Sequence, residues 1–344
     1  MANNNLKWVS AVYSMGALLV VAGHSLPFGE AYKTIPEFVL SFRSFIYIFH
    51  MPLFFFISGF LLSYTKTPLR KGYGPYIKAK AVKLLTPYIA LSAVAIIPKY
   101  LVSSYINGNV SLDFMSIVRT IFVPRENVWG HFWFIPVLFL LFVILGGLCG
   151  QKRRWLLVIA IVLSVFIYFV PLKLGVFGIS DLCKHALFFI AGMFCFEIFD
   201  KFKEILFDNK LRSYIIALIT AGIITAVLYN IMIRQTGIVN SLFRLITTFI
   251  MILLLIILGL IYEKGKLTFL DSINKHTFTI FLLSWPFQAV VEIVLNKILR
   301  LPWYVSSIGM LIIGICGPLI VAWLYKFGNL KNRFIEVCLG LEAS

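Results

Sequence analysis

Long apolar stretches alternate with short polar connections along the whole chain. A transmembrane α-helix needs roughly 20 mainly apolar residues, because it rises about 1.5 Å per residue across a hydrocarbon core about 30 Å thick. Ten stretches approach that length: 8–28, 45–64, 84–104, 132–150, 155–172, 183–199, 212–232, 242–262, 277–295 and 304–325. The pattern therefore predicts an all-α, polytopic membrane protein with about ten transmembrane helices.

Composition agrees with this pattern. The 344 residues are 60% hydrophobic and only 13% charged, whereas a soluble domain is about 45–50% apolar and about 25% charged. No connection resembles a linker or a soluble domain, so we predict one membrane domain over residues 1–344. The start of the chain could also pass for a secretory signal peptide with small residues near 22–23. The apolar segments that continue to the end of the chain favour a membrane span.

The charge of the chain predicts its orientation. A net charge of +17 could indicate a nucleic-acid partner, but in so apolar a chain we expect lysines at the cytoplasmic helix ends and no nucleic acid. With the N-terminus in the cytoplasm, about two thirds of the 31 lysines and arginines fall in cytoplasmic segments, as the positive-inside rule requires. We predict an N-in/C-in, multi-pass protein of the plasma or inner membrane, with His24 and His50 toward the outer face.

Histidines inside the first two stretches are the candidate chemical groups. Ionisable residues in membrane helices usually face the bundle interior or a water-filled cavity, and a neutral imidazole with a pKa near ~6.5 is a natural general base. His24, in SMGALLVVAGHSLPFGE, is either a general base or a structural residue that hydrogen-bonds a nearby loop. His50 lies near the start of FHMPLFFFISGFLLSY, and its role is either in a functional site or purely structural. Ser58 and Gly59 in this segment are more typical of close helix packing.

A third histidine, His131, lies in ENVWGHFWFIPVLF, two residues before Trp133 and again on the outer side. The three histidines, on different helices, could converge on one outward-facing cavity. Imidazole also suits zinc, but no HExxH motif or acidic companion at ligand spacing is present, and the five cysteines are scattered singly, so we predict neither a metal site nor a disulfide framework. The acidic residues that could orient an imidazole on this side are Glu30, Glu37, Glu126, Asp181 and Glu292.

The most basic connection, residues 65–83, lies in the predicted cytoplasm. In IKAKAVKLLTPY, Lys80 and Lys83 are three residues apart and share one face of a helix. Such a cluster could bind an anionic cofactor. It could equally attract anionic lipid headgroups, at about 1 kcal/mol per residue.

The order of these motifs resembles the membrane acyltransferase 3 family, whose members O-acylate cell-envelope polysaccharides and related acceptors. VYSMGALLVVAGHS is similar to the family's first helix, LRGLAILLVVLGHS, and FHMPLFFFISGFLL is close to its second helix throughout. KAKAVKLLTPY, GHFWFIP and TFTIFLLSWP are similar to three later family segments. The resemblance covers about residues 8–325.

The resemblance implies a cytoplasmic acyl-CoA donor, acetyl-CoA, and an acceptor hydroxyl on a cell-envelope carbohydrate or lipid-linked glycan. His24 is the implied general base, and His50 is the second candidate catalytic residue. The candidate donor-binding residues are Lys80, Lys83, Arg70, Lys71 and Tyr13. The candidate acceptor-binding residues are His131, Trp133, Arg43 and Ser58. Besides the bilayer, the expected partners are polysaccharide assembly proteins or a second copy of the chain.

The chain departs from the family pattern at several positions. Tyr13, about 16 Å before His24 along one helix face, replaces an arginine; it can hydrogen-bond but carries no charge. Lys80 and Lys83 replace arginines and lack their planar fork, and Ser284 stands where a histidine is common. Many relatives also carry a soluble esterase-like domain, so we expect the membrane domain or a separate partner to complete the transfer. A polysaccharide exporter or flippase is the alternative function, and a membrane sensor is a third.

Overall fold

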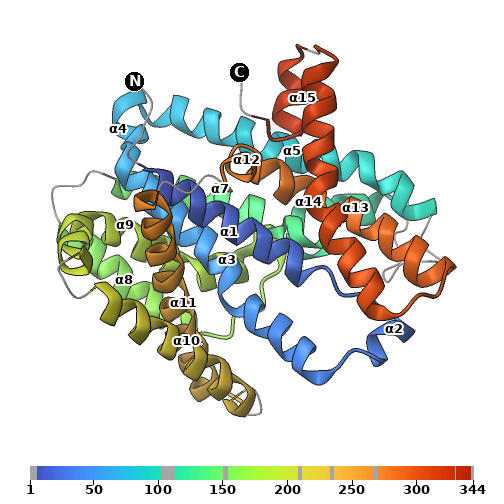
Figure 1. Cartoon of the computed structure of the whole chain (residues 1–344). Helices are drawn as coiled ribbons and strands as arrows, with labels where there is room; N and C mark the ends of the chain where they lie inside the picture. Colours follow the sequence, from blue (N-terminus) through green and yellow to red (C-terminus); the bar gives the residue numbers. More distant parts are fainter. Residues whose placement is uncertain are drawn as a thin grey trace.

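The computed structural model describes residues 6–101, 113–149, 154–207, 211–232, 236–265, 270–329 and 331–341. All regular structure within these ranges is helical (Figure 1). The longer helices are α1 (Lys7–Gly23), α3 (Glu37–Thr65), α5 (Tyr73–Leu101), α7 (Phe134–Leu145), α8 (Arg154–Phe169), α9 (Ile179–Phe207), α10 (Leu211–Met232), α11 (Ile238–Lys264), α13 (Thr277–Val291) and α14 (Trp303–Phe327). Short helices connect them: α2 (Glu30–Lys33), α4 (Thr67–Lys71), α6 (Phe114–Phe122), α12 (Asp271–Asn274) and α15 (Arg333–Cys338).

The predicted all-α membrane architecture is confirmed, because each of the ten apolar stretches overlaps a helix in the part of the chain that the structure describes. Seven helical segments of the described ranges are long and apolar enough to cross a membrane: Glu37–Thr65, Tyr73–Leu101, Gly130–Leu148, Val176–Glu204, Ile238–Lys264, Thr277–Ile298 and Trp303–Phe327. The other three stretches form shorter apolar helices, Lys7–Gly23, Trp155–Phe169 and Ile219–Tyr229. The number of about ten crossings and the N-in/C-in orientation stay predictions.

Helix ends differ from the predicted ranges for local reasons. The first helix stops at Gly23, so His24 is its C-cap and not an internal residue. Pro27 follows closely, and a proline disfavours helical backbone in the residue before it. The second helix begins at Glu37, eight residues earlier than predicted, because Glu37 and Arg43 lower the hydropathy of turns that are nevertheless helical.

The core centres on α3, which packs along α9 with very close backbones. A Cβ atom added at Gly59 would lie 1.9 Å from the carbonyl oxygen of Phe189, and one added at Gly192 would lie 1.9 Å from that of Phe56. No side chain fits at either position. The prediction that Gly59 allows close helix packing is therefore confirmed.

The helix α1 passes through the middle of the bundle (Figure 1) and runs antiparallel to α3. Near its start, the Trp8 ring packs on Phe60, 5.1 Å between centroids. Near its end, His24 packs on Tyr47, with 5.6 Å between centroids. The bundle thus has one end that carries the start of α1, α4, α12 and α15, toward the top of Figure 1. The other end carries α2 and the C-terminal end of α1, where His24 is the C-cap.

Candidate functional site

His24 lies at the C-terminal end of α1 with a fixed ring orientation. Its Nδ1 is 2.8 Å from the carbonyl oxygen of Val20, one turn earlier in the same helix. A carbonyl only accepts hydrogen bonds, so Nδ1 carries the ring hydrogen and Nε2 of the neutral ring keeps a free lone pair. The residue is half-buried, whereas His50 and His131 are 4% and 7% exposed. Of the three predicted histidines, His24 is therefore the least buried, and it keeps a basic nitrogen at Nε2.

The structure brings the three predicted histidines together. The rings of His24 and His131 are 6.1 Å apart between centroids. The Tyr47 ring lies between His24 and His50, with centroid distances of 5.6 Å to His24 and 5.2 Å to His50. The Tyr47 hydroxyl also donates to the Gly23 carbonyl oxygen at 2.8 Å, which ties α3 to the residue before His24. We call these four rings the histidine cluster.

Backbone carbonyls also fix the other two histidine rings. Nδ1 of His50 donates to Ile46 O at 2.8 Å, as expected from the helix geometry four residues apart. Nε2 of His131 donates to Phe281 O at 3.2 Å, which leaves its Nδ1 buried without a hydrogen-bond partner. A buried polar atom without a partner is costly, about 1–3 kcal/mol. Such an atom marks His131 as a candidate ligand-binding residue.

Four of the five carboxylates that could orient His24 have other partners in the described residues. Glu37 lines a separate cavity, and the others pair as follows: Glu30 with Lys33, Glu126 with Arg119, Asp181 with Arg125, and Glu292 with the backbone N–H of Phe28. The hydrogen bond from Lys33 also holds the pKa of Glu30 below its ordinary value. Main-chain carbonyls, and not carboxylates, therefore orient the histidine cluster.

A fourth histidine, His185 in α9, lies beside Trp133 and was not anticipated from the sequence. Its Nδ1 donates to the carbonyl oxygen of Asp181 at 2.7 Å, and its ring is 5.1 Å from Trp133. The Asp181 carboxylate accepts two hydrogen bonds from Arg125, at 2.6 and 2.8 Å, and the Arg125 guanidinium lies 4.0 Å above the Trp133 ring. The sequence feature that could have identified His185 is its position four residues after an acidic residue, Asp181, in an apolar helix.

Arg43 lies one turn before Tyr47 and contacts two aromatic faces. Its guanidinium carbon is 5.3 Å from the ring centre of Tyr47 and 5.6 Å from that of Tyr32 in α2. Of the candidate acceptor-binding residues, His131 therefore belongs to the histidine cluster and Arg43 adjoins it. Trp133 packs between Arg125 and His185.

Tyr13 and Ser58 form a separate polar pair between α1 and α3, with 3.1 Å between their hydroxyl oxygens. Tyr13 is half-buried and Ser58 is buried. Ser58 lies eight residues, about 12 Å, from His50 along α3. It therefore sits with the candidate donor-binding Tyr13 and not in the histidine cluster.

The candidate donor-binding cations lie at the opposite end of the bundle, in α4 and the first turns of α5. Arg70, Lys71 and Lys83 are exposed, and within the described ranges none of them forms an ion pair. Lys80 is only half-buried, with its ammonium nitrogen 3.7 Å from the ring centre of Phe142. Its cation–π contact fixes one positive charge where the helix enters the bundle.

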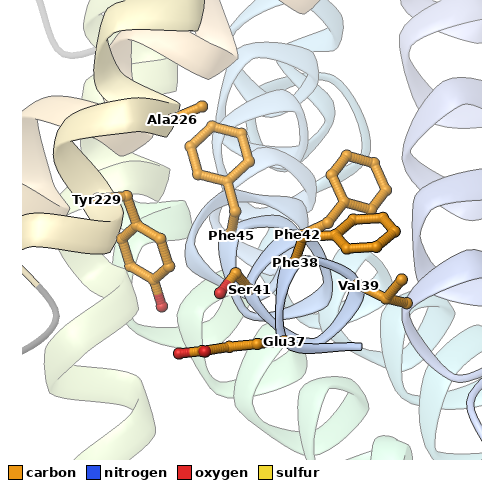
Figure 2. A pocket seen from close by; sticks show the side chains of 8 residues that line it. All are labelled: Glu37, Phe38, Val39, Ser41, Phe42, Phe45, Ala226 and Tyr229. Atoms are coloured by element: carbon orange, nitrogen blue, oxygen red, sulfur yellow. The ribbon is translucent and has the colours of Figure 1, made fainter. Parts of the chain in front are cut away.

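A cavity of about 680 Å³ lies on the other face of α3, against α10 (Figure 2). Because a helix turns about 100° per residue, Phe38, Phe42 and Phe45 point away from the face that carries Tyr47 and His50. Figure 2 shows Phe45 directed toward Ala226 of α10. This cavity is lined by Glu37, Phe38, Val39, Ser41, Phe42, Phe45, Ala226 and Tyr229, and it is not part of the histidine cluster.

Comparison with known proteins defines the class. Residues 7–326 match the family described as an acyltransferase domain. The chain belongs to this acyltransferase 3 family, as its motifs predict, and it is a multi-pass membrane protein. It is similar to Nodulation protein NolL of Mesorhizobium japonicum (strain LMG 29417 / CECT 9101 / MAFF 303099), with 30% identity over 179 residues. That match covers 51% of this chain and 44% of the relative, so it spans less than half of the relative's length. No solved structure matches the chain.

Proposed function

We propose that the chain transfers an acetyl or other short acyl group from cytoplasmic acyl-CoA to a hydroxyl of a cell-envelope carbohydrate, at the plasma or inner membrane. The observation that carries this proposal is the state of His24. Its Nδ1 donates to Val20 O, and its half-buried ring keeps a lone pair on Nε2. A neutral imidazole with a reachable lone pair is the group that activates a hydroxyl.

The exposed cations Arg70, Lys71 and Lys83, with the half-buried Lys80, suit the phosphates of a coenzyme A donor. They have no competing carboxylate partner within the described ranges. The Tyr13–Ser58 pair lies between this end and His24 and offers hydroxyl groups to the donor's amide-bearing arm. The thioester would then reach His24 between α1 and α3.

In the transfer step, Nε2 of His24 accepts the hydrogen of the acceptor hydroxyl while the hydroxyl oxygen bonds to the acyl carbonyl carbon. The resulting imidazolium gives that hydrogen to the departing sulfur as the carbon–sulfur bond breaks, and the ring returns to its starting form. The Nδ1 bond to Val20 persists through both steps and holds the ring in place. His131, Trp133 and Arg43 would hold the acceptor, and His50, beyond Tyr47, is the second candidate catalytic residue.

The decisive experiment is transfer of labelled acetyl from acetyl-CoA into envelope polysaccharide by membranes that contain His24→Ala. We expect a loss of about 100-fold or more, because that is the usual contribution of a general base. His276→Asn is the matched control: His276 is the N-cap of α13, a position that asparagine fills well, and its variant should keep full activity. Normal transfer by correctly inserted His24→Ala protein would remove His24 as the base.

A further inference from the structure

Two cations flank the histidine cluster. Arg43 lies against Tyr47, whose ring is next to His24. On the other side, the Lys99 ammonium nitrogen is 5.9 Å from the ring centre of Trp285, and that ring is 6.4 Å from His131. The two cations come from α3 and α5. Arg43 contacts a ring of the cluster itself, whereas Lys99 contacts Trp285, the ring next to His131.

Both cations are held in place without a carboxylate. Lys99 donates to the Val128 carbonyl oxygen at 2.7 Å, and Arg43 contacts the rings of Tyr32 and Tyr47. Within the described ranges neither belongs to an ion pair. Arg125 differs from these two cations, because its guanidinium donates two hydrogen bonds to the Asp181 carboxylate, which neutralises its charge.

An unpaired cation beside neutral rings is unfavourable near a membrane. Aromatic faces offset part of that cost, by about 0.5–2 kcal/mol per contact. Two such cations beside one reactive cluster create a field that favours an anion. A ligand with a negative charge would supply the counter-charge that the described residues do not.

We infer that the acceptor carries a negatively charged oxygen group next to the hydroxyl that is acylated, and that Arg43 and Lys99 bind this group. The inference rests on the proposed function and narrows its acceptor from carbohydrates in general to acidic ones. The anionic group is either the carboxylate of an acidic sugar or the phosphate of a sugar phosphate or lipid-linked sugar. The phosphates of the donor are a less suitable source, because the donor-binding cations proposed above lie at the opposite end of the bundle.

The test is a binding experiment without acetyl-CoA, on the full-length protein in lipid nanodiscs. Glucuronic acid, glucose 1-phosphate and glucose are titrated separately while tryptophan fluorescence is recorded, since Trp285 adjoins both Lys99 and His131. We expect at least one anionic probe to bind about tenfold or more tightly than glucose, as a hydrogen bond to a charged group predicts. Preference for glucuronic acid identifies an acidic sugar, and preference for glucose 1-phosphate identifies a phosphorylated one.

Arg43→Gln and Lys99→Gln should each reduce the advantage of the anionic probe several-fold, and the double variant should abolish it. Lys173→Gln, which removes one exposed cation elsewhere, should leave that advantage unchanged. Equal affinity for glucose and the anionic probes, no saturable binding of either anion, or an anion preference that survives in the double variant overturns the inference.

This outcome is separable from the proposed function. His24→Ala should keep the anion preference while it loses acyl transfer. Acyl transfer by wild-type protein without any anion preference refutes only the inference about the acceptor. Anion preference with full transfer by His24→Ala refutes only the role of His24.

Discussion

The hydroxyl of Tyr47 donates a hydrogen bond to the carbonyl oxygen of Gly23 at 2.8 Å, and this bond anchors the end of α1 just before His24. The Tyr47 ring also separates His24 from His50 and lies beneath Arg43. One side chain of α3 therefore holds the last turn of α1 at the residue before its histidine.

Tyr47→Phe should keep the ring contacts and remove only this hydrogen bond. We expect a loss of about 1 kcal/mol in stability and a fall in acyl transfer larger than any fall in donor binding, because the position of His24 is affected. Transfer assays and thermal unfolding measure the two effects. Tyr304→Phe, at an exposed tyrosine of α14, is the control, and equal behaviour of the two variants would contradict the anchoring role.

Lys80→Ala combined with Lys83→Ala should weaken acetyl-CoA binding by about tenfold or more, since each charge-assisted contact with phosphate contributes about 1.5–3 kcal/mol. Binding of acetyl-CoA to purified protein measures this. Lys78→Ala removes an exposed cation of the same helix and should change affinity little. An unchanged affinity in the double variant would assign the two lysines to lipid headgroups.

Gly59→Ala and Gly192→Ala should each prevent the close contact of α3 with α9, because the added Cβ would overlap a backbone carbonyl oxygen. We expect a low yield of monodisperse protein and a lowered unfolding temperature. Gly74→Ala is the control, since no atom lies within 4 Å of the point that its added Cβ would occupy. Size-exclusion chromatography in detergent compares the three, and normal yield of the first two would contradict this packing.

Arg125 and Asp181 should be energetically coupled. A double-mutant cycle of Arg125→Gln and Asp181→Asn isolates their interaction, and we expect about 1 kcal/mol, because Arg125 is half-exposed. Arg125→Lys should restore little of it, since lysine lacks the planar fork that makes two contacts. Additive effects of the two single variants on thermal unfolding would contradict the coupling.

Much of the fold was predictable because membrane helices depend on local composition. The apolar stretches located every major helix, while the polar first turns of α3 hid its true start. His24, His50 and His131 were recognisable singly, since a titratable ring is unusual in an apolar stretch. His185 and Lys99 were missed as site neighbours, because their relation to Trp133 and Trp285 joins residues far apart in sequence.

The sequence by itself determined the helical membrane class, the family and the position of His24 near the end of its helix, because each is written in short contiguous motifs. Only the tertiary structure decided which nitrogen of His24 is free, that backbone carbonyls and not acids orient the histidine rings, and that Arg43 lies against Tyr47 while Lys99 lies against Trp285 beside His131. These properties arise where α1, α3, α5 and α13 pack together. Contacts between segments that are distant in sequence determine this packing, and local composition does not.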